Sequence, residues 1–192
     1  MEHIVDAIAS VGARRRRSIG VVAAGAATGA LVGALTAAAQ GRLGHTLASL
    51  ANSAAPWAIA AFVVALAARR LVPAVVAATV TLAMCEVGYV LAAHLRGTSS
   101  ATATIVLWLT AASLAGPPLG LAASWTRSSD PWRRGAGIGV IPGVLVGEAL
   151  HGLARVADTT SPGYWTVELV IGVVVLAAAA VRGRRVAVAL VA

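Results

Sequence analysis

The sequence of 192 residues contains very little charge. Charged residues make up 11% of it, against about 25% in an ordinary soluble domain. Hydrophobic residues make up 59%, and the mean hydropathy is +0.86. One soluble core of this length cannot bury so much apolar surface. The composition therefore excludes a disordered chain and nearly every soluble enzyme fold, and it leaves a membrane protein with several spans.

Lysine is absent and cysteine nearly so. A single cysteine, Cys85, cannot form a disulfide within the chain, which excludes a disulfide scaffold. The basic residues are fifteen arginines against seven acids, which gives a net charge of +8. In a soluble protein this excess would indicate nucleic-acid binding. In an apolar chain, arginine clusters instead flank membrane spans and meet lipid headgroups, so we expect a lipid bilayer as partner and no nucleic acid.

Six apolar runs are candidates for membrane-spanning helices, which need about 20 residues each. The runs are Ile19–Ala39, Ala54–Ala68, Leu71–Ala93, Ala101–Ser124, Ala136–Val156 and Gly163–Val181. The runs are continuously apolar, which favours helices over the alternating strands of a β-barrel. The second run is short, and we expect its helix to extend back through Leu50 and Ala51. The prediction is an all-α bundle of six transmembrane helices over residues 19–181, with terminal segments 1–18 and 182–192.

The arginines predict an orientation. If the N-terminus is cytoplasmic, twelve of the fifteen fall on cytoplasmic segments, where arginine is enriched. The other three, Arg42, Arg96 and Arg155, fall on external segments. This sorting predicts a multi-pass protein of the inner (plasma) membrane with both termini cytoplasmic. A cleaved signal peptide is the alternative for the first run. However, about 20 apolar residues exceed the 7–15 of the hydrophobic region of a usual signal peptide.

Two runs carry small residues at four-residue spacing, which lets another helix approach closely. In the first run these are Gly25, Gly29 and Gly33, with Ala26, Ala30 and Ala34 beside them. The fifth run carries Gly135, Gly139, Gly143 and Gly147. Packing within the bundle and docking of a partner helix both need such a surface. For docking, the candidate residues are Ala26, Gly29, Ala30, Gly33 and Ala34.

Three of the seven acids, Glu86, Glu148 and Glu168, lie inside predicted spans. A charge in the middle of the membrane costs about 2.5–3.5 kcal/mol on insertion scales. Counted from the span ends at 1.5 Å per residue, all three belong to the outer half of the membrane. Their presence there requires a function or a hydrogen-bond network within the bundle.

Other polar and aromatic residues share this outer level, including Trp108. Tyr89 lies one helical turn above Glu86, and His151 lies one turn above Glu148. The candidate ligand-binding residues are Asn52, Trp57, Glu86, Tyr89, Glu148, His151, Trp165 and Glu168. Carboxylates with aromatic faces suit an organic cation or an amine-bearing heterocycle, and the same acids could carry protons. An aromatic belt and structural hydrogen bonds are the alternatives.

Metal binding and catalysis have weak support. Glu148 and His151 match half of a di-iron motif, but no second Glu-x-x-His is present. No serine or cysteine is evidently paired with a histidine and an acid. We therefore predict no metal, no cofactor and no catalytic residues, and a protein that is not an enzyme.

Four segments carry a resemblance to a known family: Leu50–Trp57, Gly116–Gly120, Gly147–Leu150 and Thr160–Trp165. They resemble an uncharacterised actinobacterial family of six-span integral membrane proteins, a domain of unknown function. The architecture also resembles the S components of energy-coupling-factor vitamin transporters. That resemblance implies a ligand pocket facing outward and a first helix that docks a membrane coupling subunit.

Together these observations predict a membrane protein that binds a small polar or cationic solute in an outward-facing pocket for uptake. A structural or regulatory membrane protein without a transported solute is the alternative. A membrane-embedded enzyme is a third possibility, which would need a histidine or acid pair around a substrate cleft.

Overall fold

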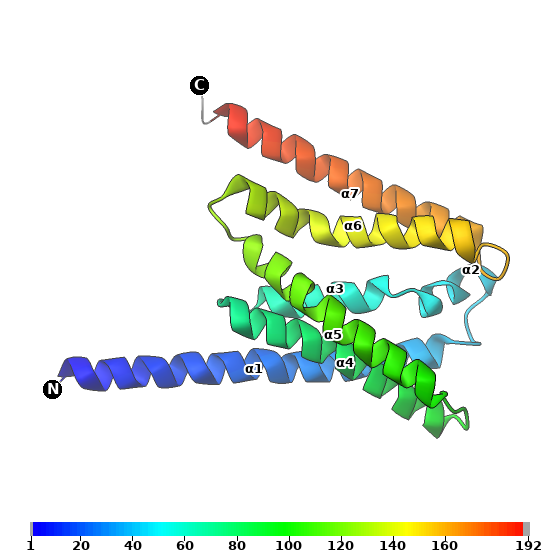
Figure 1. Ribbon diagram of the computed structural model, residues 1–192, viewed down its shortest axis with the longest axis horizontal. Coiled ribbons are helices and arrows are strands. Elements are labelled where there is room, and N and C mark those ends of the chain that lie inside the picture. The colour runs from blue at the N-terminus through cyan, green and yellow to red at the C-terminus, as the bar shows by residue number, and fades with distance from the viewer. Residues whose placement is uncertain (1, 190–192) are drawn as a thin grey trace.

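Every regular element within residues 2–189 is a helix in the computed structural model (Figure 1). The elements are α1 (Glu2–Ala39), α2 (His45–Ala48), the 3-10 helix η1 (Leu50–Asn52), α3 (Ala55–Leu66), α4 (Leu71–Leu95), α5 (Thr102–Trp125), α6 (Pro131–Arg155) and α7 (Pro162–Ala189). Side chains are described for residues 11–181 except position 45. The all-helical prediction is confirmed, while the side chains of the predicted tail, 182–192, lie outside the described residues.

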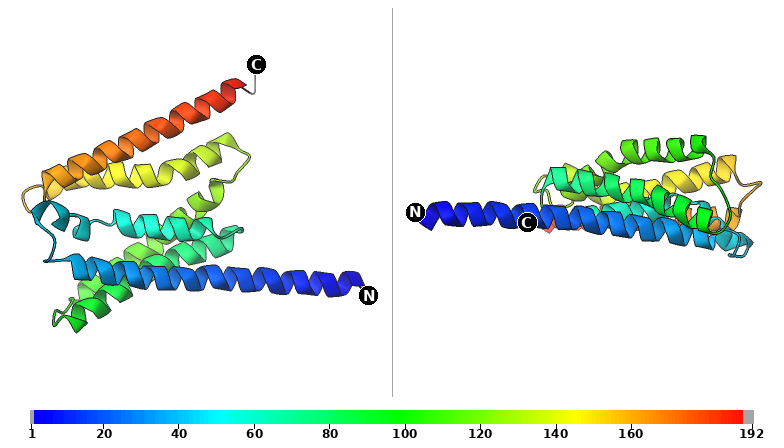
Figure 2. Two further views of the ribbon diagram at one scale, coloured as in Figure 1. Left: turned by 180° about the vertical axis from the view of Figure 1, so that it is seen from behind. Right: turned by 90° about the horizontal axis from the view of Figure 1, so that it is seen from below.

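Successive long helices run in opposite directions, so that the start of α1 and the end of α7 lie at the same end of the bundle (Figure 1). Seen from behind, α1 and α3 lie in front of α4 and α5 (Figure 2). In the described part of the chain, five helices are long and apolar enough to cross a membrane, or six if a bent pair is one span. The protein therefore has the architecture of a multi-pass membrane protein.

The bent pair replaces the continuous second helix that we expected. The segment Thr46–Asn52 meets Ala55–Leu66 at an angle of 52°, and the backbone between them is extended at Ser53. Pro56 accounts for the break. It fits the first turn of α3, but in a helix continued from Leu50 it would remove one hydrogen bond and clash with the preceding turn. The 12 residues of α3 span only about 18 Å of a hydrocarbon core of about 30 Å.

The first helix is longer than expected. It begins at Glu2 instead of Ile19, so residues 2–18 of the predicted terminal segment 1–18 belong to the same helix, while position 1 lies outside the described residues. The arginines at positions 14–17 therefore lie on α1 itself. Its 38 residues give a length of about 57 Å, well beyond the thickness of a hydrocarbon core.

Alanines make up most of the buried core, and many large apolar side chains face outward. Ala61, Ala65 and Ala78 are fully buried, whereas Leu114 is 73% exposed and Val72 is 70% exposed. A soluble protein buries its large apolar side chains. In a bilayer these side chains can face lipid, and small residues let the helices approach closely. This distribution supports the membrane assignment independently of helix length.

Three glycines of α1, Gly25, Gly29 and Gly33, pack against α4. A Cβ at Gly29 would overlap the backbone carbonyl of Thr81, and one at Gly33 would overlap that of Cys85. In return, Gly88 of α4 lies against the backbone of Ala30.

The surface predicted to dock a partner helix is thus used within the chain. Gly29 and Gly33 are buried, and Ala26, Ala30 and Ala34 are half-buried. The physical reason is that a small-residue surface accepts whichever helix the fold places beside it.

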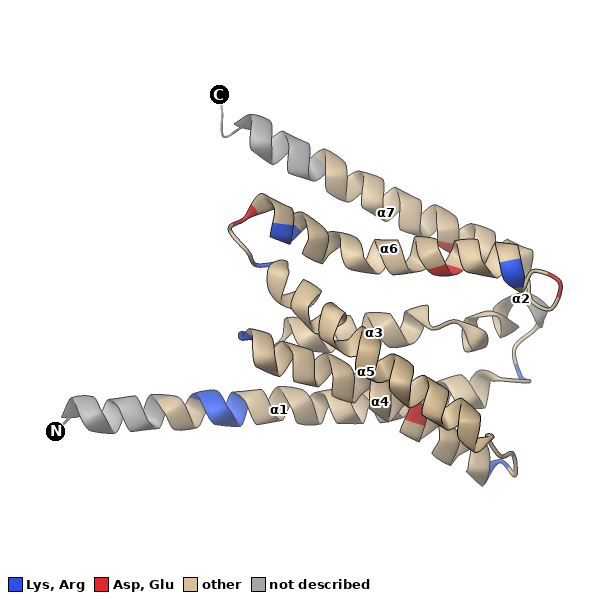
Figure 3. Ribbon diagram, viewed as in Figure 1, with Lys and Arg blue, Asp and Glu red and all other residues tan. Residues whose placement is uncertain are grey.

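The described arginines are sorted between the two ends of the bundle (Figure 3). Those at positions 14–17, 69, 70, 127, 133 and 134 belong to the N-terminal part of α1, to the α3–α4 and α5–α6 connections and to the first turn of α6, which lie at one end. Arg42, Arg96 and Arg155 follow or end helices at the opposite end. The spatial separation therefore matches the two groups distinguished in the sequence.

Candidate functional site

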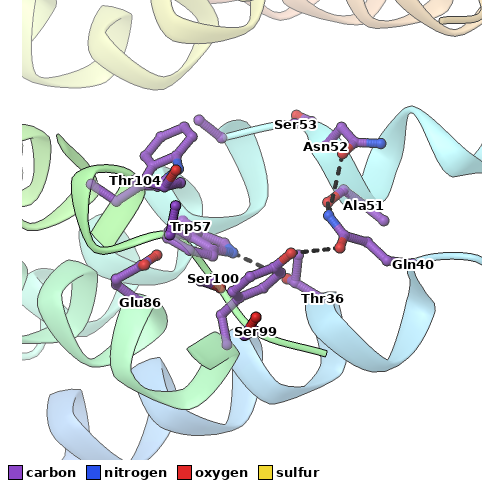
Figure 4. A pocket seen from close by; sticks show the side chains of 14 residues that line it. Thr36, Gln40, Ala51, Asn52, Ser53, Trp57, Glu86, Ser99, Ser100 and Thr104 are labelled. Carbon is purple, nitrogen blue, oxygen red and sulfur yellow. Dashed lines mark hydrogen bonds between the residues drawn. The ribbon is translucent and has the colours of Figure 1, made fainter. Parts of the chain in front are cut away.

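Figure 4 shows a cavity of about 370 Å³. Its lining residue Gln40 accepts a hydrogen bond from Arg96 through its backbone carbonyl, which places the cavity at the end of the bundle that carries Arg42 and Arg96. Its walls come from α1, η1, α3 and α4 and from the start of α5. The lining residues are Thr36, Gln40, Ala51, Asn52, Ser53, Ala54, Trp57, Glu86, Tyr89, Ser99, Ser100, Ala101, Thr104 and Trp108. This volume falls at the lower end of the range for small-molecule sites, about 300–1,000 Å³.

Glu86 is the acidic residue of the cavity. It is only 2% exposed, and it lies on the opposite side of the cavity from Asn52 and Gln40 (Figure 4). Among the described residues, no hydrogen bond and no ion pair reaches its carboxylate. A buried acid without a partner is costly unless it is neutral or a ligand supplies the missing donor.

Aromatic rings form a wall around the same space. The ring centroid of Trp57 lies 5.9 Å from that of Trp108 and 6.4 Å from that of Tyr89, with both pairs tilted. Such tilted pairs leave ring faces available for stacking or for attraction to a cation. The three rings come from α5, α3 and α4, so the wall exists only in the folded bundle.

Hydrogen bonds hold two of these rings in place. The Tyr89 hydroxyl donates to Gln40 Oε1 at 2.5 Å, and the Trp57 indole N–H donates to Thr36 Oγ1 at 3.0 Å. Gln40 Nε2 donates in turn to Asn52 Oδ1 at 3.2 Å. The cavity wall is thus a connected polar network, which restrains the positions of the side chains that would contact a ligand.

The sequence-based candidates divide into two groups. Asn52, Trp57, Glu86 and Tyr89 line the cavity together. Glu148, His151, Trp165 and Glu168 do not line it. They belong to α6, which packs on α3 and α5, and to α7, which packs on α6. The lining residues absent from the prediction are Thr36, Gln40, Ser99, Ser100 and Thr104. Gln40 is the sole glutamine of the chain, and that rarity is the signal that could have found it.

Glu148 caps the broken helix. Its carboxylate accepts from the backbone N–H groups of Ala54 at 2.6 Å and Ala55 at 2.8 Å, and from the Ser53 hydroxyl at 3.1 Å. The first N–H groups of a helix have no partner within it, and the helix dipole favours a negative charge there. Glu148 of α6 therefore provides the N-terminal cap that α3 lacks in its own sequence; we refer to this contact as the Glu148 cap.

The opposite end of α3 is capped by a positive charge. Arg127 donates to the carbonyl oxygens of Leu66 at 3.0 Å and Ala68 at 2.5 Å. A carboxylate at the N-terminus and a guanidinium at the C-terminus both match the direction of the helix dipole. Tertiary contacts thus hold a helix too short to be stable alone.

The remaining candidates occupy the α6–α7 region. His151 is exposed. Trp165 is 3% exposed, its indole N–H donates to Thr160 Oγ1 at 2.8 Å, and its ring lies against Gly152. Glu168 is 5% exposed, and both of its oxygens are buried without a hydrogen-bond partner among the described residues. No group of three histidines, cysteines or acids that could hold a metal occurs within the described residues.

Helices of this length and polarity, with alanine inside and large apolar side chains outside, define a multi-pass helical membrane protein. The chain belongs to the family of unknown function DUF6518, which matches residues 12–192. No curated protein and no solved structure matches the chain.

Proposed function

We propose that this membrane protein binds a small organic cation in the cavity between α1, α3, α4 and α5. The observation that carries the proposal is Glu86, a carboxylate that is buried, lacks a partner among the described residues and lines a cavity. An ammonium or protonated heterocycle would supply both the missing donor and the opposite charge. The three aromatic rings would then contact its apolar part and attract its charge.

The lining favours binding over catalysis. Apart from Glu86 and Tyr89, the polar lining consists of hydroxyl and amide side chains, and it contains neither histidine nor cysteine. A nucleophile activated by a neighbouring base, or a matched acid and base, would require such a partner. We therefore propose that the bound molecule leaves chemically unchanged.

The proposal places the cavity on the external side of a plasma membrane. The end with the cavity carries Arg42 and Arg96, and the opposite end carries the larger group of arginines. Because arginine is enriched on cytoplasmic segments, we assign both termini to the cytoplasm and six crossings to the chain, with α3 and the bent segment before it as one crossing. We further propose that the cavity serves solute uptake. A coupling subunit would then dock on a surface other than that of Gly29 and Gly33, which are buried against α4.

Binding of a panel of primary, secondary and quaternary amines tests the proposal in purified, lipid-reconstituted protein. We expect at least one amine to raise the melting temperature by mass action. Losing a charge-assisted hydrogen bond costs about 1.5–3 kcal/mol, so Glu86→Gln should weaken binding by about 10- to 150-fold. Trp108→Ala should weaken it by about 2- to 30-fold through the lost cation–π contact.

Two variants outside the cavity serve as matched controls. Asp130→Asn removes an exposed acid, and Trp132→Ala removes a tryptophan that is 88% exposed. Neither should change amine affinity. If no amine stabilises the protein, or if Glu86→Gln binds as tightly as the original chain, the proposal is wrong.

Chemical labelling in intact cells tests on which side of the membrane the cavity opens. Cys85 is fully buried, so a cysteine placed at Ser100 in the cavity wall is the intended reactive thiol. In intact cells, an impermeant maleimide should label Ser100→Cys, and a bound amine should slow the labelling. A cysteine at Ser128, at the opposite end, should react only after the membrane is opened. The reverse pattern would place the cavity on the cytoplasmic side.

A further inference from the structure

Glu168 is a buried acid that the cavity does not use. It lies on α7, is 5% exposed, and neither carboxylate oxygen has a hydrogen-bond partner among the described residues. An ionised carboxylate without donors is strongly disfavoured in apolar surroundings, so the group takes up a proton instead. Its burial and lack of partners therefore indicate a group that exists in this conformation in its neutral form.

The second acid beside it is in the opposite situation. Glu148 accepts three hydrogen bonds at the start of α3, the environment of an ionised carboxylate. It is also close enough to Glu168 to interact with it electrostatically, and the acidic segments of α6 and α7 face each other in Figure 3. Two neighbouring carboxylates avoid sharing negative charge, so the ionised Glu148 favours the proton on Glu168.

The surroundings of Glu168 contain no compensating positive charge among the described side chains. On α7 itself, Tyr164 interacts with both acids. On α6, Glu148 is the group that acts on Glu168, whereas His151 and Arg155 are exposed. The described side chains of α2 and of residues 49–54 before α3 include no titratable group, and Ser53 of that segment interacts with Tyr164.

We propose that Glu168 is a proton-binding site whose occupancy controls the Glu148 cap and, through α3, the shape of the cavity. With the proton bound, Glu148 is free to hold the N-terminus of α3. When the Glu168 carboxyl releases its proton to the aqueous phase, it becomes a second carboxylate beside Glu148, and repulsion weakens the cap. Ser53 and Ala54 at the capped position line the cavity, and Trp57 follows within one turn.

The proposed proton-binding site depends only on Glu148 and Glu168. The influence of that site on solute affinity rests on the proposed function. Proton binding would then regulate when the cavity is preorganised for its solute. Such coupling requires a two-state element that both sites bias. The short helix α3 is that element, since its N-terminus is held by the acid pair and its side chain Trp57 forms the cavity wall.

Two measurements on the full chain in lipid nanodiscs, without any solute, test the proposal. Infrared spectroscopy reports the carbonyl stretch of a protonated carboxyl group across a pH titration. Fluorine NMR of protein labelled with 5-fluorotryptophan reports the environment of Trp57, assigned by its loss in Trp57→Phe. Both are recorded in the Glu86→Gln background, because the buried Glu86 would give a carboxyl band of its own and lines the same cavity as Trp57. In that background we expect a carboxyl band that disappears as the pH rises and a Trp57 signal that shifts with the same midpoint.

Three further substitutions in this background decide the outcome. Glu168→Gln mimics the protonated side chain, so it should remove the band and hold the Trp57 signal at its low-pH position. Glu148→Gln should keep a Glu168 band but abolish the pH response of Trp57. Asp130→Asn, which removes an exposed acid at the opposite end of the bundle, should leave the Glu168 band and its link to Trp57 intact. The signal of the distant Trp132 should not follow the Glu168 titration.

The proposal is overturned if the titrating band survives in Glu168→Gln. It is equally overturned if Trp57 follows pH unchanged in Glu148→Gln, which keeps the test decisive even where Glu168→Gln fails to fold. Because no solute is present, these results are independent of whether the amine panel binds.

Discussion

The glycine stripes of α1 and α6 have the same four-residue spacing but opposite surroundings. In α1, Gly25, Gly29 and Gly33 are buried against α4, with no room for a Cβ. In α6, a Cβ at Gly135, Gly143 or Gly147 would meet nothing within 4 Å. The spacing therefore shows that a helix can be approached closely, but only the fold shows whether another helix does so.

Substitution in the α1 stripe should have the largest effect. The Cβ of Gly33→Ala would overlap the Cys85 carbonyl, and a backbone atom cannot rotate away as a side chain can. We expect a loss of about 3 kcal/mol, near the upper end of the usual range for overpacking, and a melting temperature lower by about 6–12 °C. Thermal unfolding of both proteins in the same detergent measures this difference in melting temperature. An unchanged melting temperature would show that α1 and α4 pack less closely than in the structure.

A close glycine elsewhere on α6 should give an intermediate effect. Gly152 lies against the ring of Trp165, whose indole is hydrogen-bonded to Thr160. Gly152→Ala must displace a side chain instead of a backbone, so we expect a loss of about 1–2 kcal/mol. The near-ultraviolet circular dichroism of the tryptophan should change with it. A loss as large as that of Gly33→Ala would contradict this ranking.

The open stripe of α6 should tolerate substitution best. At Gly143 a Cβ meets nothing, and alanine favours a helix by up to about 1 kcal/mol over glycine. Gly143→Ala should therefore leave the melting temperature unchanged or raise it slightly, measured beside Gly33→Ala in the same detergent. A clear destabilisation would mean that another surface covers this stripe.

The three membrane acids illustrate how far the sequence could predict the site. Their rarity in an apolar chain indicated that each needs a reason, and their depth placed all three at one level. The sequence did not distinguish their roles, because each role depends on a neighbour far away along the chain. Glu86 faces a cavity, Glu148 caps α3, and Glu168 has no partner among the described residues.

The second span shows the same limit for the fold. Its 15 apolar residues indicated a crossing, and Pro56 offered a local signal for a break. What makes a short helix stable at this position is Glu148 at one end and Arg127 at the other. Neither residue is near α3 in the sequence, so the capping contacts could not be inferred from it.

By itself, the sequence determined that this is an all-helical chain with several membrane-crossing segments and with arginines sorted along it. Those properties follow from the hydropathy and charge of each segment, which need no knowledge of its neighbours. The tertiary structure decided which glycines are covered, which acid faces the cavity, and which rings surround it. Those properties depend on contacts between distant segments, since side chains acquire their partners only when the helices pack.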